Sequence, residues 1–118
     1  MSNQINPEKL LSFLCETDSL TRLPRQGWIF VGIPNPEKIS DHCFQAAVIA
    51  YFFAKSVPQP VDVGKVLLML LFHETAEVRV TDLPRRASRC IGKEAKYQAE
   101  ARVLDDLLKP LAPELVTM

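Results

Sequence analysis

A histidine and two acidic residues in one short stretch are the side chains best placed for metal chemistry. His73 ends the most apolar segment, residues 66–72; Glu74 follows at once and Glu77 three residues later. On a helix, side chains three and four residues apart lie on one face. Burying two carboxylates beside an imidazole without a cation costs on the order of several kcal/mol. Imidazole with carboxylates suits Mn, Co, Fe, Ni or Zn, so the stretch predicts a divalent metal site.

His42, the other histidine of the chain, lies near the start of a predicted helix. From there it could face the same point as His73 from a neighbouring helix. A lone His-Glu pair on an amphipathic helix is usually a solvated surface pair. This pair ends an apolar segment, which favours a buried role, so spacing alone leaves both interpretations open.

The stretch from His73 to Glu77 also resembles the His-Glu-x-x-His pattern of zinc peptidases. That pattern needs two imidazoles on one helical face and a free glutamate as base. Here Glu77 occupies the place of the second histidine, which argues against a peptidase.

Composition excludes several other classes of protein. The 118 residues include 14 basic and 14 acidic side chains, whereas nucleic-acid binders carry a basic excess. The three cysteines are widely spaced and form no Cys-x-x-Cys pair, which is typical of free thiols in a reducing compartment. The N-terminus has no signal-peptide pattern, and residues 66–72 fall far short of the roughly 20 needed to span a bilayer. We expect a cytoplasmic protein with no role at nucleic acid or membrane.

Helices must position these residues, because no strand pattern is convincing. Asn6, Pro7 and Glu8 predict a helix start, with Asn as cap, and that helix runs to about residue 20. A long proline- and glycine-containing loop follows, and a loop of that length is usually functional. Further helices are expected at about 40–53, 61–78 and 92–109, and another begins near 112–115. The inward face of the 92–109 helix is predicted to be Tyr97, Ala101, Val103, Leu104, Leu107 and Leu108. The fold class is all-α.

Four short strings, in order, resemble the HD-domain 5′-deoxynucleotidase family. They are Leu-Pro-Arg-Gln-Gly-Trp at 23–28, Ser-Asp-His at 40–42, His-Glu-Thr-Ala-Glu at 73–77 and Thr-Asp-Leu-Pro at 81–84. Each string is weak alone, but four in this order are specific. The resemblance implies an all-α HD helical bundle that binds one divalent cation, commonly cobalt or manganese.

The resemblance also implies roles for individual residues. His42 and His73 match metal-binding histidines, and Glu74 stands where the family has an aspartate ligand. The acids that match Glu77 and Asp82 lie beside the metal and take part in acid-base work. Arg25 matches an arginine that contacts the 5′-phosphate, and Trp28 matches an aromatic near the sugar that favours deoxyribose.

The activity implied is metal-dependent removal of phosphate from 2′-deoxynucleoside 5′-monophosphates. We expect one HD domain over residues 1–118 that lacks the family's C-terminal helices and forms a homodimer. The family's late aspartate ligand lies beyond residue 118, and Asp105 and Asp106 fit an amphipathic helix better than a metal site. The alternative, given Glu74 and the absent ligand, is a non-catalytic or degraded HD module that binds a nucleotide or a protein partner.

Overall fold

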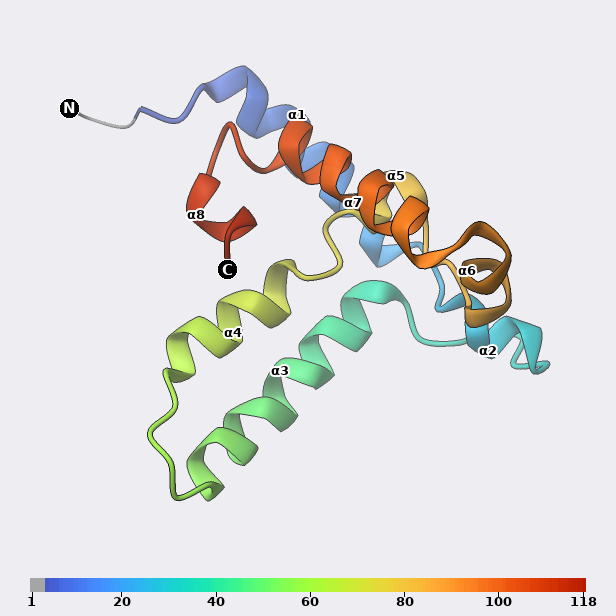
Figure 1. Cartoon of the computed structure of the whole chain (residues 1–118), viewed down its shortest axis with the longest axis horizontal. Coiled ribbons are helices and arrows are strands. Elements are labelled where there is room, and N and C mark those ends of the chain that lie inside the picture. The colour runs from blue at the N-terminus through green and yellow to red at the C-terminus, as the bar shows by residue number, and fades with distance from the viewer. Residues whose placement is uncertain (1–3) are drawn as a thin grey trace.

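Helices make up nearly all of the regular structure in residues 4–118, the part of the chain that this computed structural model describes (Figure 1). Within those residues there is no strand, only an isolated bridge between Pro24 and Lys38. The predicted all-α class is therefore confirmed. The elements in chain order are α1 (Pro7–Thr17), η1 (Asp18–Thr21), α2 (Gln26–Phe30), α3 (Ile39–Ser56), α4 (Val63–Phe72), α5 (Glu77–Val80), α6 (Arg85–Ile91), α7 (Lys93–Leu107) and α8 (Pro113–Val116).

Side-chain caps explain where three of these helices begin. Asn6 accepts hydrogen bonds from the backbone N–H groups of Glu8 and Lys9, and so starts α1 where the sequence predicted it. The Asp41 carboxylate accepts from the backbone N–H of Lys38 at the start of α3. The Asp62 carboxylate accepts from the backbone N–H of Lys65 and so caps the start of α4. Each cap satisfies N–H groups that have no partner inside the helix.

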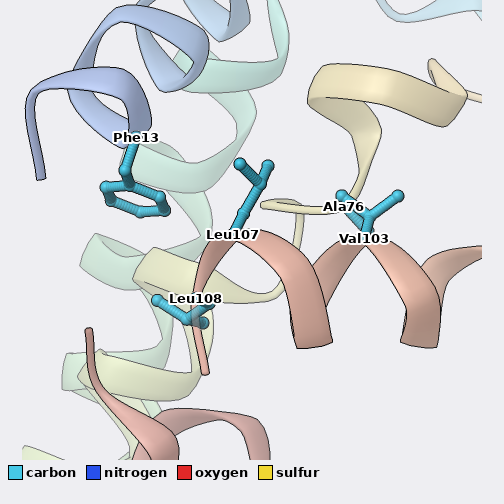
Figure 2. Packing of buried hydrophobic residues seen from close by; sticks show 5 residues of the cluster. All are labelled: Phe13, Ala76, Val103, Leu107 and Leu108. Carbon is cyan, nitrogen blue, oxygen red and sulfur yellow. The ribbon is translucent and has the colours of Figure 1, made fainter. Parts of the chain in front are cut away.

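Helices α3 and α4 form an antiparallel hairpin, while α7 lies close to α1 and α5 (Figure 1). The buried apolar cluster holds residues of α1, of the C-terminal end of α7 and of the turn before α5, and Figure 2 shows it. Its buried members are Phe13, Ala76, Val103, Leu107 and Leu108. A salt bridge joins α5 to α1, because the Arg79 guanidinium donates to both carboxylate oxygens of Glu16 at 2.8 and 2.9 Å.

The predicted helix over residues 61–78 is wrong at its C-terminal end. Helix α4 ends at Phe72, turns follow, and α5 begins at Glu77. In a continuing helix the Leu70 carbonyl would accept from the backbone N–H of Glu74. Here the His73 ring reaches that carbonyl instead, with Nδ1 at 2.6 Å from it. The ring contact thus accompanies the end of the helix.

Two other expectations need correction. The predicted loop between the first two long helices contains the short helix α2, and it is closed by bonds from Arg25 N to Glu37 O (3.0 Å) and from Ile39 N to Leu23 O (2.9 Å). Tyr97 does not face inward, since it is 68% exposed. The buried residues of α7, Val103 and Leu107, lie in its C-terminal half, whereas Tyr97 lies in its N-terminal half.

The short helix α6 was not predicted either, because its sequence is rich in arginine and lacks an apolar stripe. Across residues 4–118, no helix has the length and apolarity required to cross a membrane. All three cysteines are free thiols, and Cys43 is buried in α3.

Candidate metal centre and adjoining pocket

Three potential metal ligands meet between the facing ends of α3 and α4. His42 lies in the first turn of α3, His73 directly follows α4, and Glu74 comes next in the turn. One ligand atom from each lies within 4.8 Å of the other two. Glu74 Oε1 is 2.8 Å from His73 Nε2 and 3.8 Å from His42 Nε2. The structure therefore brings together the three residues that the sequence predicted as metal ligands.

This donor set fits one divalent cation. Ligand bonds of about 2.0–2.2 Å place donor atoms up to roughly 4.3 Å apart, so the observed spacing needs only a small side-chain adjustment. The 2.6 Å contact between His73 Nδ1 and the Leu70 carbonyl orients the ring and leaves Nε2 for the ion. A backbone acceptor on the far nitrogen is the usual support for a histidine ligand.

His73 and Glu74 each shift the pKa of the other. The hydrogen bond to Glu74 is the main cause of a raised pKa at His73, against the opposing effect of burial. Burial disfavours the ionised form of Glu74, but hydrogen bonds with His73 and Glu77 outweigh it and lower the Glu74 pKa. The charge of Glu74 therefore favours the protonated form of His73, and a cation bound between them would take the place of that proton.

Glu77 lies next to the three potential ligands, and its carboxyl group is buried with little to stabilise a negative charge. It is only 7% exposed, and its Oε2 is buried with no hydrogen-bond partner. Burial, contact with the Glu74 carboxylate and the charge of Asp82 raise the pKa of Glu77 to about 9. A cation nearby would lower that pKa, because opposite charge favours the ionised form. An orphaned carboxyl oxygen beside three donors is a second sign that the site suits a metal ion.

Asp82 and Arg25 lie near Glu77, since the charges of both act on the pKa of Glu77. The Asp82 carboxylate accepts from the backbone N–H of Gln26 at 2.9 Å, and thereby holds the start of α2. Arg25 Nε lies 4.0 Å from Asp82 and 3.9 Å from Glu37.

Thr81 has an unusual backbone conformation immediately before Asp82. Its backbone has φ 62° and ψ 173°, a conformation found almost only in glycine that costs on the order of 1–3 kcal/mol. Backbone strain of this kind, stored immediately before Asp82, gathers at functional sites.

A cavity of about 400 Å³ adjoins this group, and Arg25, Trp28 and Asp82 all line it. Trp28 is half exposed, and its indole N–H donates to Glu37 Oε1 at 3.4 Å. Arg85, at the start of α6, lines the same cavity. Sequence reasoning did not select Arg85, and the one signal for it was a pair of arginines directly after Pro84.

Asp105 and Asp106 take no part in the metal cluster. Asp105 pairs with Lys109 at 3.1 Å, and Asp106 pairs with Arg79. Both carboxylates are largely exposed, as expected for solvated acids on an amphipathic helix.

Comparison with known proteins decides the family. Residues 17–117 match the HD domain, which is nearly the whole of the chain. The chain belongs to the HD domain family. An HD domain implies a divalent metal ion, and His42, His73 and Glu74 are the described residues whose geometry fits one.

Relatives of this HD domain include proteins named 5′-deoxynucleotidase HDDC2. The one from Xenopus laevis is 30% identical over 110 residues, which cover 93% of this chain and 52% of the relative. The one from Homo sapiens is 29% identical over 106 residues, which cover 90% of this chain and 50% of the relative. This HD domain thus spans about half the length of the curated relatives it matches.

A solved structure shares the fold. A conserved hypothetical protein from Pyrococcus furiosus superposes with a TM-score of 0.78 and 34% identity, over 91% of this chain and 62% of that one. The arrangement of the helices in this chain is thus shared with a solved structure.

Proposed function

We propose that this HD domain is a metal-dependent phosphohydrolase that removes phosphate from 2′-deoxynucleoside 5′-monophosphates. The observation that carries the proposal is the meeting of His42, His73 and Glu74. Arg25, which lines the cavity together with Trp28, lies near enough for its charge to act on the pKa of Glu74. The names of the curated relatives, 5′-deoxynucleotidases, support this substrate class.

The cation would be held by His42, His73 and Glu74, and cobalt or manganese suits these ligands. When bound, it supplies Lewis acidity toward a phosphoryl oxygen and lowers the pKa of water. Arg25 is proposed to bind the 5′-phosphate, because its planar guanidinium can donate two parallel hydrogen bonds to it. Arg25 is positioned for this by Asp82 and Glu37, both about 4 Å away.

Glu77 and Asp82 are the proposed proton-handling residues. Glu77 has a raised pKa and an unpaired oxygen, so it can exchange a proton near neutral pH once the local charge is balanced. Asp82 holds the start of α2 and remains close to Arg25. In the overall reaction, water attacks phosphorus, the P–O5′ bond breaks, and the nucleoside oxygen receives a proton.

Trp28 is proposed to contact the sugar and to favour substrates without a 2′-hydroxyl. Its half-exposed indole borders the cavity and leaves an apolar surface there. An apolar contact penalises a hydroxyl that loses its water without gaining a partner.

Two further proposals concern the setting of the enzyme. The three free thiols support the cytoplasmic location that the sequence suggested. The homodimer expected from the family resemblance also stays a proposal.

Phosphate release from the four 2′-deoxynucleoside 5′-monophosphates and their ribonucleotide counterparts, with added Mn²⁺ or Co²⁺, tests the function. We expect metal-dependent release that is roughly 5- to 150-fold faster for the deoxy series, since one unsatisfied hydroxyl costs about 1–3 kcal/mol. Trp28→Ala should reduce that ratio, while Tyr97→Ala, at an exposed position on α7, should leave it unchanged. Folded protein that binds metal but releases no phosphate from any nucleotide would favour a non-catalytic nucleotide-binding module.

A further inference from the structure

A second arginine lines the cavity that holds Arg25 and Trp28. Arg85 borders this space of about 400 Å³ together with those two residues and Asp82. Arg25 is the residue directly before α2, whereas Arg85 is the first residue of α6. Two guanidinium groups from distant parts of the sequence therefore reach one cavity.

Contacts outside the cavity hold Arg85 in this place. The Arg86 guanidinium lies 5.5 Å from the centre of the Phe30 ring, a cation–π contact that joins α6 to α2. The Ser88 hydroxyl donates to the Leu83 carbonyl at 3.3 Å and ties α6 to the segment before it. Figure 1 shows α6 beside α2. Arg85 is thus carried on a helix that is fixed against one wall of the cavity.

The charge of Arg25 is already offset by its neighbours. Its Nε lies 3.9 Å from Glu37 and 4.0 Å from Asp82, so these three side chains together carry one net negative charge. A phosphate monoester carries a charge of about −1.5 to −2 at pH 7. A phosphate that approaches Arg25 therefore meets two carboxylates of its own sign, and a further cation is needed to balance them.

The metal centre does not supply that balance alone. The Glu74 carboxylate among the proposed ligands offsets one of the two charges of a divalent cation. Glu77, which lies against Glu74, offsets the other once it is ionised. Arg85, by contrast, takes part in none of the ion pairs formed by residues 4–118. Its charge is therefore available to a ligand in the cavity.

We propose that Arg85 is a second phosphate-binding residue, which holds the 5′-phosphate of the substrate together with Arg25. The inference rests on the proposed function, because it assigns a further contact to the phosphate that this reaction removes. Each guanidinium can donate two parallel hydrogen bonds to phosphate oxygens. Arg85 also favours the nucleotide over the nucleoside product, since the product has no anionic group for it to bind.

Titration of the 118-residue chain with inorganic phosphate and with deoxyadenosine 5′-monophosphate tests the proposal, at constant ionic strength and with chelator present to prevent hydrolysis. Trp28 is the single tryptophan of the chain and lines the cavity, so its fluorescence reports binding there. Arg85→Ala should raise both dissociation constants about 10-fold, the lower end of the range for hydrogen bonds to charged groups, because Arg85 is exposed. Arg85→Lys keeps the charge and should lose less affinity.

Arg89→Ala is the matched control. It removes the same charge from an exposed position on the same helix, but Arg89 does not line the cavity. Both dissociation constants should stay within about twofold of wild type, as is usual for a solvated surface charge. With Mn²⁺ added, Arg85→Ala should raise KM far more than it lowers kcat, because bound substrate and transition state both contain the phosphate contact.

Arg85→Ala protein that binds phosphate as tightly as wild type would overturn the proposal. So would a loss of affinity confined to deoxyadenosine 5′-monophosphate, which would place Arg85 against the nucleoside, or a wild-type chain that binds neither ligand. Failure of the proposed function has a different result. A wild-type chain that binds the nucleotide through Arg85, but releases no phosphate with Mn²⁺, would keep the phosphate site and reject the hydrolase.

Discussion

Replacing His42 with alanine is expected to weaken Mn²⁺ or Co²⁺ binding by at least about 100-fold and to remove metal-dependent phosphate release. Groups that merely support a metal ligand change affinity by about 10–100-fold, and His42 is a proposed ligand, so its loss should exceed that range. Its Nε2 is 3.8 Å from Glu74 Oε1, and within the metal cluster it is the only donor from α3. Isothermal titration with each metal measures the affinity directly.

Lys55→Ala is the control for this variant, because Lys55 is exposed at the opposite end of the same helix. It should bind metal as the wild-type chain does. His42→Ala protein that keeps wild-type metal affinity would remove His42 from the ligand set and contradict the site as described.

Glu77→Gln is expected to lower the turnover rate by roughly 10²–10⁴-fold, the usual contribution of a general acid or base. Glutamine keeps the shape of the buried side chain but cannot ionise. Metal affinity should change much less than in His42→Ala, because Glu77 is not one of the three grouped donors. Turnover within about threefold of wild type would assign proton handling to another group.

The same variant has a predicted pH signature in the metal-free protein. The pKa of Glu77 rises from 4.5 in the unfolded chain to about 9 on folding, so the folded state binds more protons between these values. The resulting stability is complete below pH 4.5 and is lost as pH rises toward 9. His73, whose pKa is also raised, acts in the same direction. Denaturant unfolding with chelator present should show that the free energy of unfolding of the wild-type chain decreases as pH rises. In Glu77→Gln the decrease should be less steep. Equal slopes in the two proteins would contradict the burial of an ionisable Glu77.

Local sequence signals were enough to predict the main helices and to select His73 and Glu74 as candidate metal ligands. The cap at Asn6 and the apolar run before His73 can both be recognised from residues that are neighbours in the sequence. The grouping of His42 with His73 needed one further idea, that α3 and α4 are adjacent. The order of the four motifs supplied it, because that order resembles a family whose fold places those helices together.

Features set by distant contacts could not be predicted in the same way. The bond between Asp82 and the backbone N–H of Gln26 joins residues 56 positions apart, and it helps to fix α2 inside a segment that reads as a loop. The end of α4 coincides with the contact between the His73 ring and the Leu70 carbonyl. The orientation of that ring cannot be predicted from helix periodicity. Tyr97 fits the apolar stripe of α7 by spacing, yet no neighbour covers it.

Metal titration of the 118-residue wild-type chain tests the central claim most directly. Calorimetry with Mn²⁺ or Co²⁺ should show one ion bound per chain, with protons released on binding because His73, whose pKa is raised, must be neutral to ligate the ion. Absence of binding to well-folded protein, or equal binding by a His42→Ala/His73→Ala double variant, would contradict a metal centre at these residues.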